Sequence, residues 1–150
     1  MIVDWLSKPQ SVDRCLKTVF FEGYDYVHSS ALAPGGDRVF LCAWNGIRGG
    51  CLFVHDLAHH STLQTSVRFY EGSHCTISDD GRLLAVGKDP HHRIHFYSAH
   101  LLKELGSVGE VPGFLRKLCF SPSGRLLAAG SDGTLKVWDT ANGELLFARD

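Results

Sequence analysis

One short frame recurs three times along the chain, and its spacing restricts the fold more than any other feature. Each copy runs from an apolar residue through a polar turn to an Arg, and an apolar run follows. The copies are LAPGGDR (Leu32–Arg38), ISDDGR (Ile77–Arg82) and FSPSGR (Phe120–Arg125). A second apolar run then follows each copy. His55, Tyr97 and Trp138 occupy equivalent positions in these second runs, and successive ones are 42 and 41 residues apart. The chain is therefore built from a unit of about 40–45 residues.

Short apolar runs between turn residues predict that each unit consists of β-strands. The runs are rich in Val, Leu, Ile, Phe and Ala, and Gly, Asp, Ser and Pro separate them. Asp132 and Gly133, between two such runs, are a strong hairpin signal. No segment carries a helical apolar stripe of useful length. A period of this length with four short strands is typical of a β-propeller, so the sequence predicts an all-β fold of four-stranded antiparallel blades.

The frame also predicts where the blades begin and end. Residues 1–21 are expected to finish a preceding blade, and three blades are expected at 22–67, 68–108 and 109–150. A seven-bladed ring would need roughly 290 residues, so we expect a partial propeller, about half of a ring. Because repeat units need neighbours to bury their core, we expect the chain to be a fragment of a longer polypeptide. Pairing of two copies into one ring, or blades from another subunit, are the alternatives.

The segment FSPSGRLLAAGSDGTLKVWDTANGELL, from Phe120 to Leu146, resembles a WD-repeat (WD40-type). Upstream, Gly23 and Tyr24 take the place of the Gly-His pair of that family, and the middle repeat has Tyr97 and Ser98 where Trp-Asp is expected. The resemblance covers nearly the whole chain. It implies a β-propeller that serves as a protein-interaction platform. It also implies structural roles within the blades for Asp89, Asp132, Trp138 and Asp139.

Blades of the WD-repeat family are tied together by a hydrogen-bonded His, Ser, Asp and Trp, and this chain departs from that set. In the third repeat Asp132 and Trp138 match, whereas Glu110 and Ala129 replace the His and the Ser. In the middle repeat Asp89 matches the Asp. Each lost buried hydrogen bond forgoes roughly 0.5–1.5 kcal/mol. Blade cohesion is therefore expected to rest mainly on packing of the apolar strands.

The loops at one end of the predicted blades are rich in aromatic and basic side chains. In an antiparallel blade, the loop that enters the first strand and the turn between the second and third strands share this end. Aromatic residues and Arg anchor protein interfaces, and similar WD-repeat proteins concentrate partner contacts at corresponding positions. The alternative is that Tyr26 and Phe114 simply cover the edges of their blades. The predicted partner-binding residues are Tyr24, Tyr26, His28, Trp44, Arg48, Lys88, Arg93, Phe114 and Arg116.

Charge and cysteine content restrict the partners and the compartment. The chain has 15 Lys and Arg against 16 Asp and Glu, so nucleic acid is not expected as the main partner. No apolar run approaches the length of a membrane helix, and a membrane partner is not expected either. The five cysteines are odd in number and form no C-x-x-C pair. This favours a reducing compartment, the cytosol or the nucleus.

No combination of residues in the sequence predicts catalysis, a metal or a cofactor. The nine histidines lack a specific metal-ligand spacing. His74 and Cys75 are neighbours that a strand points to opposite faces, so the imidazole is not placed to activate the thiol. The glycine pairs lie in strand–strand turns and have no helix N-terminus for phosphate binding. Arg38, Arg82 and Arg125 are expected at the same turn of successive blades, as solvated turn residues rather than an anion-binding ring.

The main functional hypothesis is a non-catalytic interaction scaffold within a multi-protein assembly. One alternative is a phosphoinositide-binding propeller recruited to membranes, with Arg48 in the sequence Ile47-Arg48-Gly49-Gly50 at its anion site. The other is the substrate receptor of a cullin-type ubiquitin ligase. Such receptors often carry an Arg two residues after Trp-Asp, where this chain has Ala141.

Overall fold

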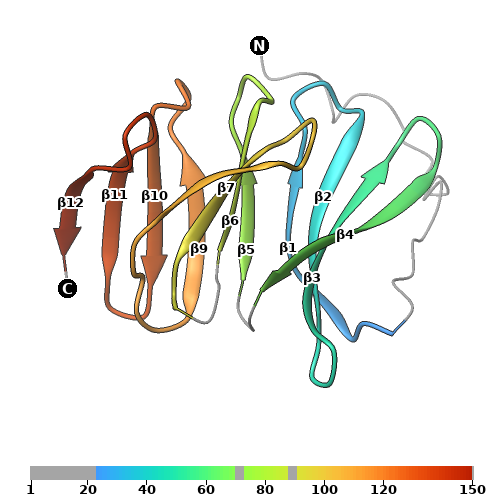
Figure 1. The fold of residues 1–150 in the computed structure, drawn as a ribbon, viewed down its shortest axis with the longest axis horizontal. Coiled ribbons are helices and arrows are strands. Elements are labelled where there is room, and N and C mark those ends of the chain that lie inside the picture. The colour runs from blue at the N-terminus through green and yellow to red at the C-terminus, as the bar shows by residue number, and fades with distance from the viewer. Residues whose placement is uncertain (1–22, 70–72, 88–90, 150) are drawn as a thin grey trace, which may run out of the picture.

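The computed structural model describes residues 23–69, 73–87 and 91–149, and within these ranges the chain forms strands and no helix. Twelve described strands make three four-stranded antiparallel sheets, each in sequential order (Figure 1). Blade 1 consists of β1 (Tyr26–Leu32), β2 (Arg38–Asn45), β3 (Gly49–Asp56) and β4 (Ser61–Phe69). Blade 2 consists of β5 (His74–Ile77), β6 (Leu83–Gly87), β7 (Ile94–Ser98) and β8 (Glu104–Val108). Blade 3 consists of β9 (Leu115–Phe120), β10 (Leu126–Ser131), β11 (Leu135–Asp139) and β12 (Leu145–Arg149).

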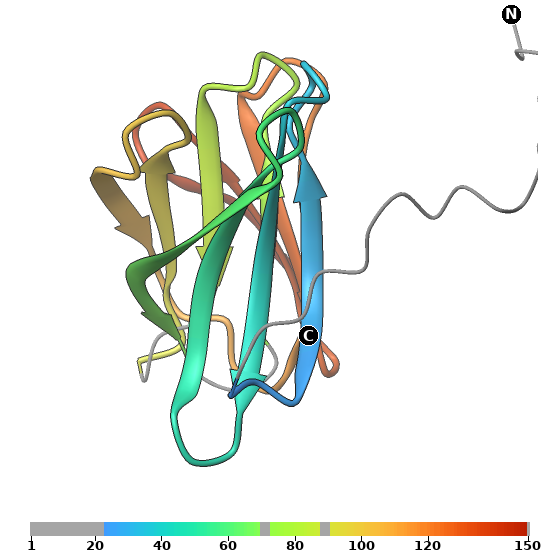
Figure 2. The same cartoon turned by 90° about the vertical axis from the view of Figure 1, so that its right-hand side faces the viewer.

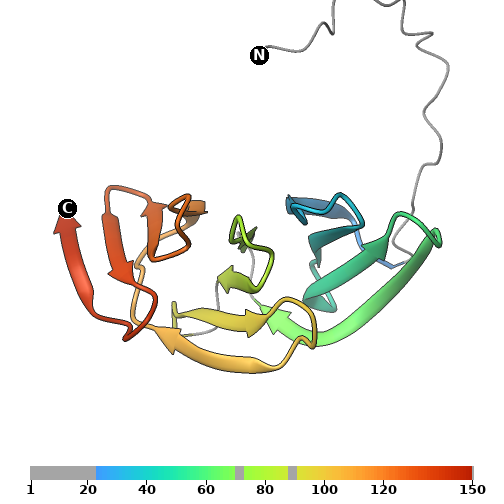
Figure 3. The same ribbon diagram turned by 90° about the horizontal axis from the view of Figure 1, so that it is seen from above.

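The blades fan out as an arc, with the first strand of each on the concave side (Figure 3). β1, β5 and β9 lie side by side there, and β4, β8 and β12 are the outer strands. Figure 2, which looks onto blade 1, shows the twist that makes β4 run obliquely to β1. The predicted all-β partial propeller is confirmed. The expected preceding blade, residues 1–21, lies outside the described residues.

Apolar side chains fill both interfaces between neighbouring blades. Phe40, Leu52 and Leu84 are fully buried in the cluster that joins blades 1 and 2. Leu127 and Trp138 belong to the cluster that joins blades 2 and 3. A fully buried large apolar side chain contributes about 1.5–3 kcal/mol, so these two clusters are the main source of blade cohesion.

The far side of blade 3 has no neighbouring blade among the described residues. Leu135 and Phe147 are exposed. Phe147 pairs with Val137, two positions from Leu135, so strand alternation places these side chains on one face of the sheet. Trp138 faces the other way, into blade 2.

The turn that precedes the second strand has the same backbone in all three blades. Gly36, Gly81 and Gly124 have φ of 69°, 71° and 68°, which favours glycine. The residue after each glycine accepts a hydrogen bond from the residue that follows the third strand. These pairs are Leu57 N–H to Asp37 O, Ala99 N–H to Arg82 O and Thr140 N–H to Arg125 O, at 2.8–2.9 Å.

The expectation that Arg38, Arg82 and Arg125 are equivalent is therefore wrong for Arg38. Asp37 occupies the position of Arg82 and Arg125, and Arg38 is the first strand residue, equivalent to Leu83 and Leu126. A shift of one residue along a strand turns the side chain to the opposite face of the sheet. The Arg38 side chain therefore does not share the direction of the Arg82 and Arg125 side chains.

Candidate interaction surface

The loop face is the end of the blades that carries the turns β2–β3, β6–β7 and β10–β11, at the bottom of Figure 1. The first strand of each blade begins at this end, because Tyr26 pairs with Trp44, His74 with Gly87 and Leu115 with Ser131. The predicted partner-binding residues of the described ranges belong to this end or to the chain just before it. Lys88 and Asp89 lie outside the described residues.

Phe114, Arg116 and Asp132 form an ordered group at the start of blade 3. Arg116 Nε donates to Asp132 Oδ1 at 2.7 Å, and the Phe114 N–H donates to Asp132 Oδ2 at 3.3 Å. The Arg116 guanidinium lies 5.6 Å from the centre of the Phe114 ring, a cation–π distance. Phe114 is 53% exposed. Asp132 therefore holds an exposed aromatic ring and an exposed cation in one fixed arrangement.

Tyr26 and His28 form a second aromatic group at the start of blade 1, with Tyr26 exposed and His28 half-buried. Their rings meet edge to face with centroids 5.4 Å apart, and Tyr26 is 53% exposed. Trp44 is half-buried on the paired strand. The two aromatic groups thus lie on the first strands of blades 1 and 3, on either side of blade 2.

Basic side chains from all three blades meet on the first strands. Burial lowers the pKa of His74, and the charges of His28, Lys117 and Arg116 lower it further. Ser30, Thr76, His74 and Lys117 line a polar cavity of about 260 Å³ along these strands. His74 and Lys117 were not predicted as site residues. Their signal in the sequence is their position, because His74 pairs with Gly87 and Lys117 with Gly130, equivalent glycines near the end of the second strand.

Tyr24 and Arg48 pack against blade 1. The Tyr24 ring meets Phe53 edge to face at 5.0 Å, and its hydroxyl accepts a 2.9 Å hydrogen bond from Gln64. Burial is the main reason that the pKa of Tyr24 is raised. A Cβ at Gly23 would lie 2.6 Å from Arg48 Nη1, so the Arg48 guanidinium rests on the glycine backbone. Tyr24 is thus engaged within the blade, whereas Arg48 is exposed and lies against Gly23.

Ile47 is the most exposed large apolar residue of the described chain, at 96%. It occupies the tip of the β2–β3 turn. Asn45 fixes this turn, since its Oδ1 accepts from the backbone N–H groups of Ile47 and Arg48 at 2.8 and 3.0 Å. Ile47 is not among the predicted partner-binding residues, although its neighbour Arg48 is. A fixed, exposed aliphatic side chain is an anchor that a partner can bury.

The remaining predicted residues have local partners. Arg93 Nε donates to Ser107 Oγ at 3.1 Å. Trp138 is buried between blades 2 and 3. Asp139 fixes the β11–β12 turn, because its Oδ1 accepts from the Ala141 N–H at 2.8 Å.

Among the residues that the structure describes, there is no group of three or more His, Cys, Asp or Glu side chains that could hold a metal ion. The described part of the chain also includes no helix that is long and apolar enough to cross a membrane.

Three radial blades of four antiparallel strands define a segment of a β-propeller. Residues 104–139 match the family model of the WD domain, G-beta repeat. No curated protein matches the chain significantly. The chain thus has the fold of a partial β-propeller, and the matched segment, from β8 to β11, is similar to a WD repeat.

Solved structures share the fold at low sequence identity. The structure of RRP9 WD40 repeats superposes with a TM-score of 0.70 at 18% identity, over 87% of this chain and 40% of that one. U3-55K gives a TM-score of 0.69 at 18% identity, with 87% and 40% covered. Hydrazine synthase of Kuenenia stuttgartiensis gives 0.68 at 20% identity, with 82% and 36% covered. The chain thus spans well under half the length of these structures.

Proposed function

We propose that this chain is a non-catalytic WD-repeat scaffold that binds a protein partner of a larger assembly through its loop face. The observation that carries the proposal is the fixed group of Phe114, Arg116 and Asp132. An exposed ring and guanidinium held in place by an ion pair lose little conformational entropy on binding, which is the property of an interface anchor. Tyr26 and Ile47 supply further exposed apolar surface on the same face.

The charge of the first strands favours an acidic segment of the partner. Besides burial, the charges of His28, Lys117 and Arg116 lower the pKa of His74, so these basic groups lie close to it. A carboxylate-rich segment would relieve this repulsion and gain electrostatic steering. The partner is therefore expected to combine acidic residues with an apolar side chain that packs on Phe114 or Tyr26.

The test is co-purification of the partner with the full chain from cells that express it. The double variant Phe114→Ala, Arg116→Glu removes the anchor and inverts its charge, and loss of the main partner is expected. The matched control is Arg82→Glu, which changes the same charge at an 88% exposed side chain on the opposite end of the blades. An unchanged partner in the double variant, with an unchanged thermal melt, would refute the site.

The remaining expectations follow from the same proposal. We expect the protein to act in the cytosol or the nucleus and to need no cofactor. The alternative is phosphoinositide binding through Arg48, an exposed side chain that lies against Gly23. Liposome flotation with and without phosphoinositides tests it directly.

We also propose that the apolar face of blade 3, with Leu135 and Phe147, is covered by another blade in the working protein. Repeat units stabilise one another through such faces. A longer form of this polypeptide, a second copy or another subunit are the three sources. The mass of the particle in solution distinguishes them. A 16.5 kDa monomer with a cooperative melt would contradict all three.

A further inference from the structure

The one-residue offset of Arg38 places its side chain between blades 1 and 2. Its side chain is 26% exposed, whereas those of Arg82 and Arg125 are 88% and 76% exposed. Blades 2 and 3 carry Leu83 and Leu126 at the equivalent position. Blade 1 thus has a cation where the other two blades have an aliphatic side chain.

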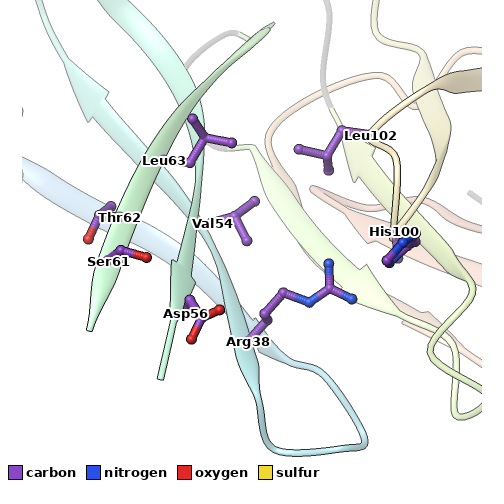
Figure 4. Close-up of a pocket in the computed structure, with 9 residues that line it drawn as sticks. Arg38, Val54, Asp56, Ser61, Thr62, Leu63, His100 and Leu102 are labelled. Carbon is purple, nitrogen blue, oxygen red and sulfur yellow. The ribbon is translucent and has the colours of Figure 1, made fainter. Parts of the chain in front are cut away.

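Arg38 lies in a groove at the end of the blades opposite the loop face (Figure 4). The groove has a volume of about 420 Å³, within the range of ligand sites. Val54 and Leu63 of blade 1 and Leu102 of blade 2 form its apolar wall. His100 lies across from Arg38, and the guanidinium points into the space between them (Figure 4).

The corresponding groove between blades 2 and 3 has neither the arginine nor the histidine. Leu83 takes the place of Arg38 there, and Ala141 takes the place of His100. The backbone hydrogen bonds that follow the third strands establish this correspondence, because Ala99 and Thr140 donate to equivalent carbonyls. The cationic groove is therefore a departure of one repeat from its neighbour.

The guanidinium of Arg38 has little compensation within the described chain. Its Nε is shielded from solvent and has no hydrogen-bond partner. The only carboxylate close to this Nε among the described residues is that of Asp37, with Oδ2 at 3.4 Å in an ion pair that is not a hydrogen bond, and the Asp37 side chain is more than half exposed. Asp56, the acidic residue of the groove wall, is engaged by His59, whose backbone N–H and ring Nδ1 lie 2.7 and 3.0 Å from its oxygens. The terminal nitrogens of Arg38 remain available to a ligand.

Leu102 supports the same groove at a cost in backbone strain. Its φ is 54°, in the left-handed region, and the equivalent residue of blade 3 is Gly143 with φ 73°. A branched side chain at such a position costs of order 1–3 kcal/mol relative to an unstrained backbone. Blade 2 thus keeps an aliphatic side chain in the groove wall where glycine would fit the turn better.

We propose that this groove binds the C-terminal carboxylate of a peptide whose last residue is aliphatic. The planar guanidinium of Arg38 matches a carboxylate in a bidentate arrangement, and His100 offers a further donor. Val54, Leu63 and Leu102 enclose the aliphatic side chain. β4, which contributes Leu63, is an edge strand whose outer backbone groups are unpaired in the sheet, so it can pair with the peptide backbone. A bare inorganic anion would use the guanidinium alone and leave the apolar wall in water.

The test is titration of the full chain with a short acetylated peptide that ends in Val-Leu, followed by calorimetry and by NMR of the Leu methyl groups. The free acid is expected to bind and to shift the Leu63 and Leu102 methyl signals. Amidation of the same peptide is expected to weaken binding by about tenfold or more, since it removes a charge-assisted bidentate pair. Arg38→Leu should abolish binding of the free acid, and Arg82→Leu is the matched control that should leave it unchanged.

Four results would overturn the proposal. One is equal affinity for the acid and the amide. Another is binding that survives Arg38→Leu. The third is absence of binding by the free acid at about 1 mM peptide. The fourth comes from competition with inorganic phosphate. If phosphate displaces the peptide and the peptide never shifts the Leu methyl signals, the groove binds anions only and the peptide proposal fails.

Discussion

Replacement of Arg38 by Leu is expected to stabilise the fold, although it removes an ion pair. The variant restores the residue type that Leu83 and Leu126 provide in the other blades. A shielded donor without a hydrogen bond costs about 1–3 kcal/mol, and Arg38 Nε is such a donor. The pair with Asp37 involves an exposed carboxylate and contributes at most about 1 kcal/mol. Leucine also keeps the apolar contacts of the arginine stem.

The net expectation is a gain of about 1 kcal/mol in the free energy of unfolding, or a rise in Tm of roughly 2–4 °C for a chain of this size. Urea denaturation followed by tryptophan fluorescence measures the free energy, and a thermal melt by circular dichroism gives the Tm. Arg82→Leu, at an 88% exposed position, should change the free energy of unfolding by less than about 0.5 kcal/mol.

A loss of stability of about 1 kcal/mol or more in Arg38→Leu would refute the reasoning, because it would mean that the guanidinium is well compensated in the folded chain. A gain in stability together with a loss of peptide binding would instead show that the blade keeps a cation at the expense of stability. Natural proteins commonly retain such residues at binding sites.

Three further predictions concern the packing, the loop face and the pH dependence. Gly50→Ala should destabilise the chain by about 1–3 kcal/mol, because the added Cβ would meet the Phe69 ring and would lie 2.9 Å from the Phe69 backbone oxygen. A denaturant melt measures this loss. Asp132→Asn should weaken partner binding in the co-purification assay while the melt changes little, since it releases Arg116 at an exposed site. His74 has a lowered pKa, so below about pH 6.5 the unfolded chain takes up a proton before the folded chain does and the free energy of unfolding falls. His74→Asn should reduce this acid sensitivity, and denaturant melts between about pH 5.5 and 7.5 measure it; an unchanged slope would exclude His74 as its source.

The fold was predictable from the sequence because the repeat fixes both the strand period and the turn positions. Short apolar strands between glycine turns leave few other architectures for a unit of this length. The register of Arg38 was misread because the three arginines were aligned by residue identity. The glycines carry the geometry, since Gly36, Gly81 and Gly124 share a left-handed φ. Counting from the glycine places Asp37, not Arg38, at the turn.

The loop-face residues were predictable as a set but not in their individual environments. Strand order alone places Tyr26 and Phe114 at one end of the blades. Whether a side chain there is free depends on contacts that are distant in sequence, such as Tyr24 on Phe53 and its hydrogen bond from Gln64. Such contacts depend on the twist of β4 over its blade, which the repeat pattern does not encode.

The groove and the loop face show how a repeat protein can acquire distinct sites without altering its framework. The turn glycines are needed by every blade, and they are the same in all three copies. Arg38 and His100 stand at positions where a side chain points between blades, and there Leu83 and Ala141 serve packing equally well. A residue that departs from its equivalents while weakening local packing is therefore the better functional candidate. By that criterion Arg38 is a stronger functional candidate than Arg82 or Arg125. Their side chains are exposed, so any blade could carry them without a loss of stability.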